Sequence, residues 1–297
     1  MLLDRDGIAG YIPHRHANHL LDSARRLNAD EIECVASLQP DDPYNRALFL
    51  QKIDGVSCIL DSILVEIMAL GMIVAEGPVP ADKLVVFAMI NNFVYTPLDP
   101  VYNDPIITRL RTLNRRQRFF KSEGHVMQSG QRVASAELMA TIIQANEPAA
   151  PPVLAKAVLP VSKSGVPVDK TRFSRHPDLV VCDTILHDTS DRIISSYEFK
   201  PTHVLVPGHF PDMPVMMGVL QWQSVADVLY ITQQPGVYTC TASLYNQHGY
   251  SVSVITGCVI QVYETHSHCL KTARVAFKSR IHPGDTVFTD ITIVKKA

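Results

Sequence analysis

The sequence predicts an α+β fold made of two similar halves. Each half contains one long apolar stretch of helical length, residues 55–77 in the first and 218–236 in the second, with glycine at or near both ends. After each stretch come segments rich in β-branched and aromatic residues, interrupted by Pro-Gly or Pro-Asn turns, as in antiparallel strands. A helix followed by several strands, repeated once, therefore accounts for most of the chain.

The strands can be placed in order on the same grounds. In the first half, residues 83–113 predict two strands around a proline-rich turn, and the alternating segment 130–144 predicts a further strand. In the second half, residues 272–294 predict two strands around Pro-Gly. Both halves thus supply one helix and an antiparallel sheet.

A proline-rich segment separates the halves. Residues 145–169 contain five prolines among Ala, Ser and Val, a composition typical of a semi-rigid linker. We therefore predict three parts: residues 1–144, the linker 145–169, and residues 170–297.

Composition excludes several classes of protein. Of the 297 residues, 46% are hydrophobic and 19% charged, which argues against disorder, and the net charge of −2 argues against a nucleic-acid partner. No apolar run approaches the roughly 20 residues that cross a bilayer, and the first ten residues lack the apolar core of a signal peptide. The six cysteines are isolated, which predicts buried reduced thiols. We expect a soluble, cytoplasmic protein that does not bind a membrane.

One segment carries a specific pattern. Residues 208–227, GHFPDMPVMMGVLQWQSVAD, resemble the active-site segment of the β-hydroxyacyl-acyl-carrier-protein dehydratases: Gly-His-Phe-Pro, a further proline, then Gly-Val-Leu at the start of a helix. Weaker similarities lie at residues 11–23, 90–104 and 277–287. The resemblance implies a tandem double hotdog, in which two long central helices are wrapped by one continuous antiparallel β-sheet.

The chemistry of dehydration suits two residues of this segment. Removal of the α-proton of a 3-hydroxyacyl thioester needs a base, and His209 lies on a loop with a side chain that titrates near neutral pH. The developing enolate oxygen needs a hydrogen-bond donor. Gly218 begins the helix, so its N–H is unpaired, and without a Cβ it lets a thioester approach. Alone, His209 could equally be a surface histidine; the surrounding motif favours a catalytic role.

The acid is missing from this segment. The family has Asp or Glu five residues after the glycine, where this chain has Gln223, which cannot donate a proton to a leaving hydroxyl. In the family, the histidine of one hotdog works with the carboxylate of its partner, which here would be the other half. We predict Asp61, six residues after Gly55, as the acid, with Glu66 as the rival.

The predicted function is dehydration of 3-hydroxyacyl thioesters to trans-2-enoyl thioesters, in fatty-acid or polyketide-type biosynthesis. The substrate would be carried by acyl carrier protein or CoA, without cofactor or metal. Two alternatives stay open: a thioesterase on the same fold, and a non-catalytic acyl-binding protein. The chain would be a pseudo-dimer, and further homodimerisation stays open. The predicted substrate-binding residues are Phe210, Pro214, Val219, Leu220 and Gln223.

Two other clusters of polar residues are weaker candidates. The arginine-rich segment 109–121 is either a solvated strand end or a positively charged rim for a carrier protein or a phosphate. Residues 264–269 bring two histidines and a cysteine together, without the spacing of a zinc site.

Overall fold

A large antiparallel sheet forms the framework of the molecule. The structure is a computed structural model that describes residues 2–80, 82–98, 104–144 and 165–296. Across the sheet the strands are β1 (Leu2–Asp4), β2 (Ser23–Arg26), β3 (Glu31–Ala36), β7 (Ile106–Arg116), β8 (Phe119–Gln128), β9 (Gln131–Gln144), β6 (Lys83–Tyr95), β15 (Ser267–Phe277), β14 (Ser251–Val262), β13 (Gly236–Asn246), β16 (Thr286–Lys296), β12 (Arg192–Glu198), β11 (Thr184–Asp188) and β10 (Val166–Pro167). The predicted large antiparallel sheet is confirmed.

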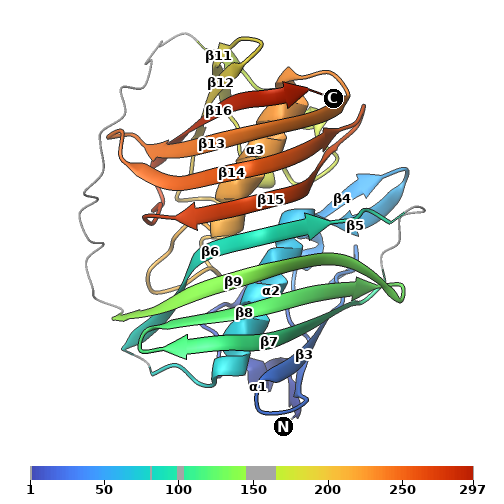
Figure 1. Ribbon diagram of the computed structural model, residues 1–297, viewed down its shortest axis with the longest axis vertical. Helices are drawn as coiled ribbons and strands as arrows, with labels where there is room; N and C mark the ends of the chain where they lie inside the picture. Colours follow the sequence, from blue (N-terminus) through green and yellow to red (C-terminus); the bar gives the residue numbers. More distant parts are fainter. Residues whose placement is uncertain (1, 81, 99–103, 145–164, 297) are drawn as a thin grey trace.

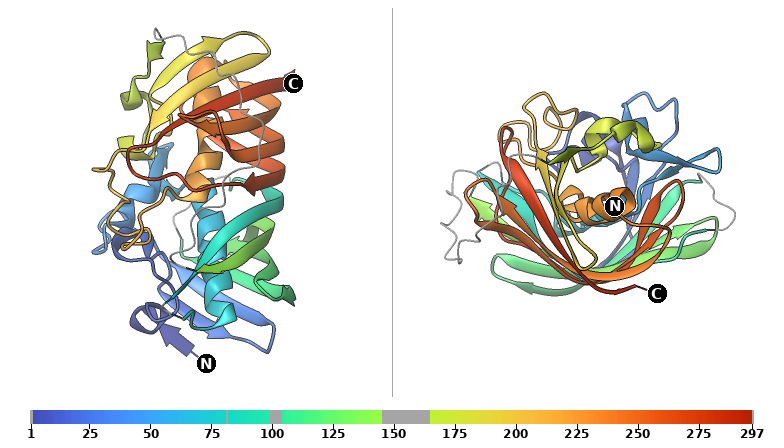
Figure 2. Two further views of the ribbon diagram at one scale, coloured as in Figure 1. Left: turned by 90° about the vertical axis from the view of Figure 1, so that its left-hand side faces the viewer. Right: turned by 90° about the horizontal axis from the view of Figure 1, so that it is seen from above.

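The two halves meet through one pair of strands. β6 from the first half pairs antiparallel with β15 from the second, with Ile90 opposite Val275. The sheet therefore continues from one half into the other, and it curves around the helices (Figures 1 and 2). The linker prediction falls largely on residues 145–164, which lie outside the described residues.

Two helices pack against the inner face of the sheet. α2 (Asp61–Glu76) and α3 (Gly218–Thr232) are buried along almost their whole length and contact each other. Gly77 follows α2 with a φ of +101°, a conformation that favours glycine and ends the helix. The shorter helices are α1 (Arg5–Ile8) and the 3₁₀ turns His16–Asn18, Arg46–Phe49, Lys170–Arg172 and Pro177–Leu179.

The first helix begins later than predicted. Residues 50–59 form a hairpin of β4 (Leu50–Ile53) and β5 (Val56–Ile59). Its turn is Asp54-Gly55, with φ values of +50° and +82°, as in the two-residue turns that favour Asp-Gly. The apolar run 56–60 fits a strand as well as a helix, and the turn decides for the strand. The prediction of a helix from residue 55 was therefore wrong for its first six residues.

One hydrophobic core runs through both halves. It includes Trp222 on α3, which packs edge-on against Phe93 of β6 at a ring-centroid distance of 4.7 Å, so the halves share side chains as well as strands. All six cysteines are buried free thiols. Within the described ranges, none of the helices is long and apolar enough to cross a membrane.

Candidate active site

A cavity of about 90 Å³ lies where the two halves meet. Its polar end is formed by His14, Glu66 and His209. Its apolar walls come from α2, β6, β15 and the loop before α3: Ala69, Ile73, Val85, Val86, Phe87, Phe210, Met213, Val215, Met216 and Phe277. The remaining lining residues are Gly218, Gln221, Ser279 and Arg280. A polar end beside an apolar slot suits an acyl thioester.

His209 is held in place by its own loop. Its Nδ1 lies 2.6 Å from the carbonyl oxygen of Val215, to which it donates, so the lone pair of the neutral ring lies on Nε2. Phe210, the next residue, has a φ of +56°, unusual for a bulky side chain and found where a site fixes the backbone. The Gly-His-Phe-Pro pattern therefore builds a rigid turn with one free imidazole nitrogen.

The N-terminal segment brings His14 to the same place. Arg15 N donates to Gly208 O at 2.9 Å, and Asn18 Nδ2 donates to Leu205 O at 3.1 Å, which joins this segment to the His209 loop. A Cβ on Gly208 would collide with Arg15 and Asn18, so glycine is needed there. The rings of His14 and His209 lie 5.0 Å apart.

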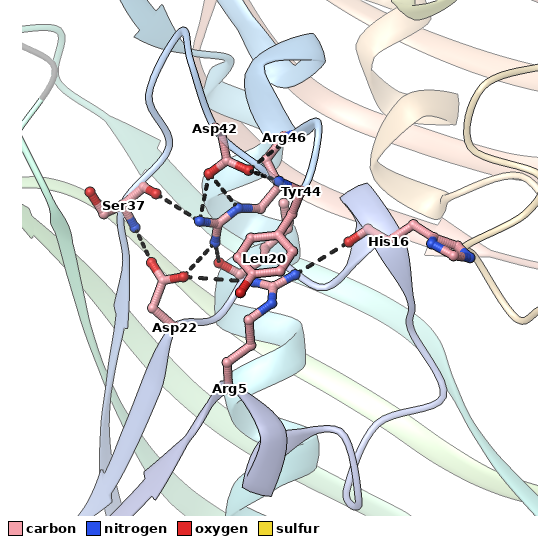
Figure 3. A network of polar contacts seen from close by, with 8 residues as sticks. All are labelled: Arg5, His16, Leu20, Asp22, Ser37, Asp42, Tyr44 and Arg46. Carbon is pink, nitrogen blue, oxygen red and sulfur yellow. Dashed lines mark hydrogen bonds and ion pairs between the residues drawn. The ribbon is translucent and has the colours of Figure 1, made fainter.

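A buried arginine network anchors the N-terminal segment (Figure 3). Arg46 forms ion pairs with Asp22 and Asp42 and donates to the carbonyl oxygens of Leu20 and Ser37. Arg5 donates to the carbonyl of His16. The strands and turns on both sides of His14 are thereby fixed to one another.

The acid at the cavity is Glu66. It lies in the second turn of α2, is buried, and its Oε1 is 3.7 Å from Nε2 of His14. One ligand-forming atom from each of His14, Glu66 and His209 lies within 4.8 Å of the others. A histidine from the second half and a carboxyl group from the first half therefore meet in one cavity.

Burial sets the protonation states of the pair. It lowers the pKa of His209 to about 4, although the bond to Val215 O opposes this shift. Burial raises the pKa of Glu66 to about 7. Near pH 6 His209 is therefore neutral and able to accept a proton, while Glu66 is largely protonated and able to give one.

The other predicted site residues divide into two groups. Gly218 begins α3 and lines the cavity, where an added Cβ would lie 3.0 Å from the Phe277 ring. Phe210 also lines it. Pro214, Val219, Leu220 and Gln223 are not among its lining residues; Val219 and Leu220 lie in the core. A wall from the first helix was predicted, but from residues 55–64, whereas the structure uses Ala69 and Ile73; the wall from β6 was not predicted, because no local motif marks it.

Asp61, the predicted acid, lies elsewhere. It begins α2, and its Oδ2 accepts a hydrogen bond from Cys269 N of β15 at 2.6 Å. It is not a lining residue of the cavity, although burial raises its pKa to about 6. The structure therefore does not bring Asp61 and His209 together. Counting from the first helical residue, Asp61 corresponds to Gly218 and Glu66 to Gln223, so Glu66 occupies the position at which the resemblance implies an acid.

Gln223 belongs to a different buried group. Its Nε2 donates to Oδ1 of Asp227 at 2.9 Å, and the same carboxylate pairs with Arg175. Val181 N donates to the other oxygen of Asp227. The cavity near the start of α2 is only about 20 Å³, little more than the space for one water. The Arg175–Asp227 ion pair therefore lies beside Gln223, the residue of the second half that corresponds to Glu66.

The two weaker clusters are also accounted for. In the arginine-rich segment, Arg109 pairs with Glu33, Arg111 with Glu123, and Arg115 with Glu76. These carboxylates compensate much of the positive charge proposed for a carrier rim. His266 and His268 lie among aromatic rings of Tyr263 and Tyr95 rather than in a metal-ligand arrangement.

Comparison with known proteins supports the resemblance that the sequence shows to the dehydratases. No protein-family model matches the chain. The 3-hydroxyacyl-acyl-carrier-protein dehydratase FabZ of Syntrophobacter fumaroxidans is 26% identical over 152 residues, which cover 47% of this chain and 94% of that protein. The resemblance to the hydroxyacyl-thioester dehydratases is confirmed over about half of the chain.

Two solved structures align with most of the chain. A variant of the PpsC dehydratase domain from Mycobacterium tuberculosis aligns over 88% of this chain and 98% of its own, at 13% identity and a TM-score of 0.45. A putative thioesterase from Novosphingobium aromaticivorans aligns over 92% of this chain and 98% of its own, at 11% identity and a TM-score of 0.43.

Proposed function

We propose that this chain is a double-hotdog hydro-lyase that converts 3-hydroxyacyl thioesters into trans-2-enoyl thioesters. The observation that carries the proposal is the meeting of His209 and Glu66 in one cavity, with pKa values shifted in opposite directions by burial. The substrate arm would be acyl carrier protein or CoA, since the relative just described is named for a carrier-bound substrate. α2 and α3 against one continuous sheet support the double-hotdog assignment.

In the proposed reaction the substrate lies with its thioester at the start of α3. His209 Nε2 removes the α-proton, and the N–H of Gly218 at the helix N-terminus stabilises the enolate oxygen. Glu66 protonates the departing hydroxyl, which leaves as water. Return of the proton from His209 to Glu66 restores both groups, so the cycle balances without a cofactor.

Incubation with a 3-hydroxyacyl-CoA tests the proposal. We expect loss of one water from the acyl chain by mass spectrometry, and in His209→Ala a rate lower by about 10²–10⁴-fold, the usual contribution of a general base. His268→Gln, a buried histidine outside the cavity, is the matched control. Release of free thiol without an enoyl product would instead establish a thioesterase, and substrate binding without turnover would establish an acyl-binding protein.

The pH profile of kcat/KM is a second expected result. Activity requires neutral His209, which is reached as pH rises above about 4, and protonated Glu66, which is lost as pH rises above about 7. We therefore expect a bell-shaped profile with its maximum between these values. The measurement is initial rate at low substrate concentration across this range. A rate that keeps rising through pH 8 would contradict the assignment of Glu66 as the acid.

A further inference from the structure

We infer that His14, Glu66 and His209 form a binding site for a single Zn²⁺ ion, and that the bound ion blocks the proposed dehydration. The inhibition rests on the proposed function, whereas the binding of zinc does not. Two imidazoles and one carboxylate are a common set of protein ligands for zinc, with a fourth position left to water. That fourth position would face the cavity.

The first support is the state of His14. Both of its ring nitrogens are buried, and neither has a hydrogen-bond partner among the described residues. Buried polar atoms without a partner are costly and uncommon in folded proteins, so they call for an occupant. One of these nitrogens, Nε2, lies 3.7 Å from Oε1 of Glu66, which is too far for a hydrogen bond. A metal ion between the two atoms would accept the lone pair of this nitrogen.

The second support is the orientation of the other ligands. Val215 O accepts from Nδ1 of His209, the outer contact that typically fixes a zinc-bound histidine and leaves Nε2 for the metal. The candidate ligand atoms lie within 4.8 Å of one another. Tetrahedral zinc would need them about 3.4 Å apart, which follows from bond lengths of about 2.1 Å. Side-chain shifts of about 1 Å close that difference.

The chemistry of the cluster favours zinc over harder cations. Ca²⁺ and Mg²⁺ prefer oxygen ligands, while two imidazole nitrogens suit Zn²⁺. Because the ion would occupy Nε2 of His209 and the carboxylate of Glu66, neither group could transfer a proton. Zinc and substrate would therefore exclude each other.

Titration of the metal-free full chain with ZnCl₂ against a zinc-responsive chelating dye tests the inference. We expect one ion per chain. The substitution His14→Ala should weaken the affinity of the chain for zinc. The loss should exceed about 10–100-fold, the typical effect of removing an outer-shell partner of a metal ligand. The substitution His14→Gln keeps most of the side-chain volume, so it is the second variant in case His14→Ala disturbs the fold. Near-ultraviolet circular dichroism shows whether each variant keeps its tertiary packing.

The thiols are the necessary control. Cys258 and Cys269 lie with sulfurs 3.5 Å apart and could themselves hold zinc. Cys258→Ser should leave zinc affinity unchanged, and the Co²⁺ complex of the wild type should lack a thiolate-to-cobalt charge-transfer band. Absence of binding, or binding that depends on Cys258 and not on His14, overturns the inference.

Inhibition is measured separately. Zinc should abolish turnover of 3-hydroxyacyl-CoA by the wild type, and EDTA should restore it. The His14→Ala variant should need a much higher zinc concentration for the same fractional inhibition, with its own zinc-free rate as the reference. A protein that binds zinc at His14 but shows no dehydration would refute the proposed function alone. A protein that dehydrates but does not bind zinc would refute this inference alone.

Discussion

Glu66→Gln is expected to lower kcat for dehydration by about 10²–10⁴-fold, the contribution of a positioned general acid. Glutamine has nearly the same shape but no proton to give to a leaving hydroxyl. The side chain is buried at the end of the cavity, so bulk water is poorly placed to replace it. Because the apolar walls stay intact, KM should change much less than kcat. Steady-state kinetics near pH 6 measure both.

Asp61→Asn is the matched control, since both carboxyl groups are buried on α2 and both have a raised pKa. Asparagine keeps an oxygen that can accept from Cys269 N, so turnover should stay close to that of the wild type. The reverse pattern, with Asp61→Asn inactive and Glu66→Gln active, would identify Asp61 as the acid.

The contrast between these two residues shows how far the sequence could lead. His209 and Gly218 were predictable because a short motif sets their spacing along the chain, and the structure places both at one cavity. The need for an acid from the other half was also predictable from Gln223. Which carboxyl group of the first half reaches the cavity depended on the residue at which α2 begins. The Asp54-Gly55 turn carried that signal, because it forms a hairpin and moves the start of the helix to Asp61.

Other parts of the site had no local signal. The pairing of β6 with β15 joins segments about 180 residues apart, and it places Phe87 beside Phe277 in the cavity wall at a ring distance of 5.6 Å. Nothing in either strand alone specifies this partner. The same holds for His14, which reaches His209 only because the N-terminal segment packs on the loop at Gly208.

Arg175→Met is expected to lower the free energy of unfolding by about 3–5 kcal/mol, the typical effect of breaking a buried ion pair. The Asp227 carboxylate is fully buried and would lose its cation. The bonds from Gln223 and Val181 would remain, but neither donor carries a charge. Against a total stability of about 5–15 kcal/mol, this loss is large. Urea unfolding followed by circular dichroism measures it.

A double replacement separates the cost of the unpaired charge from that of lost packing. Arg175→Met with Asp227→Leu removes both charges, so much of the lost stability should return. Dehydration below the melting temperature should persist in both variants, because neither residue lines the His209 cavity. If Arg175→Met changed the unfolding free energy by less than about 1 kcal/mol, the Arg175–Asp227 pair would contribute no more to stability than an exposed ion pair. That result would also show that the buried pair beside Gln223, the residue that corresponds to Glu66, is not a main source of stability.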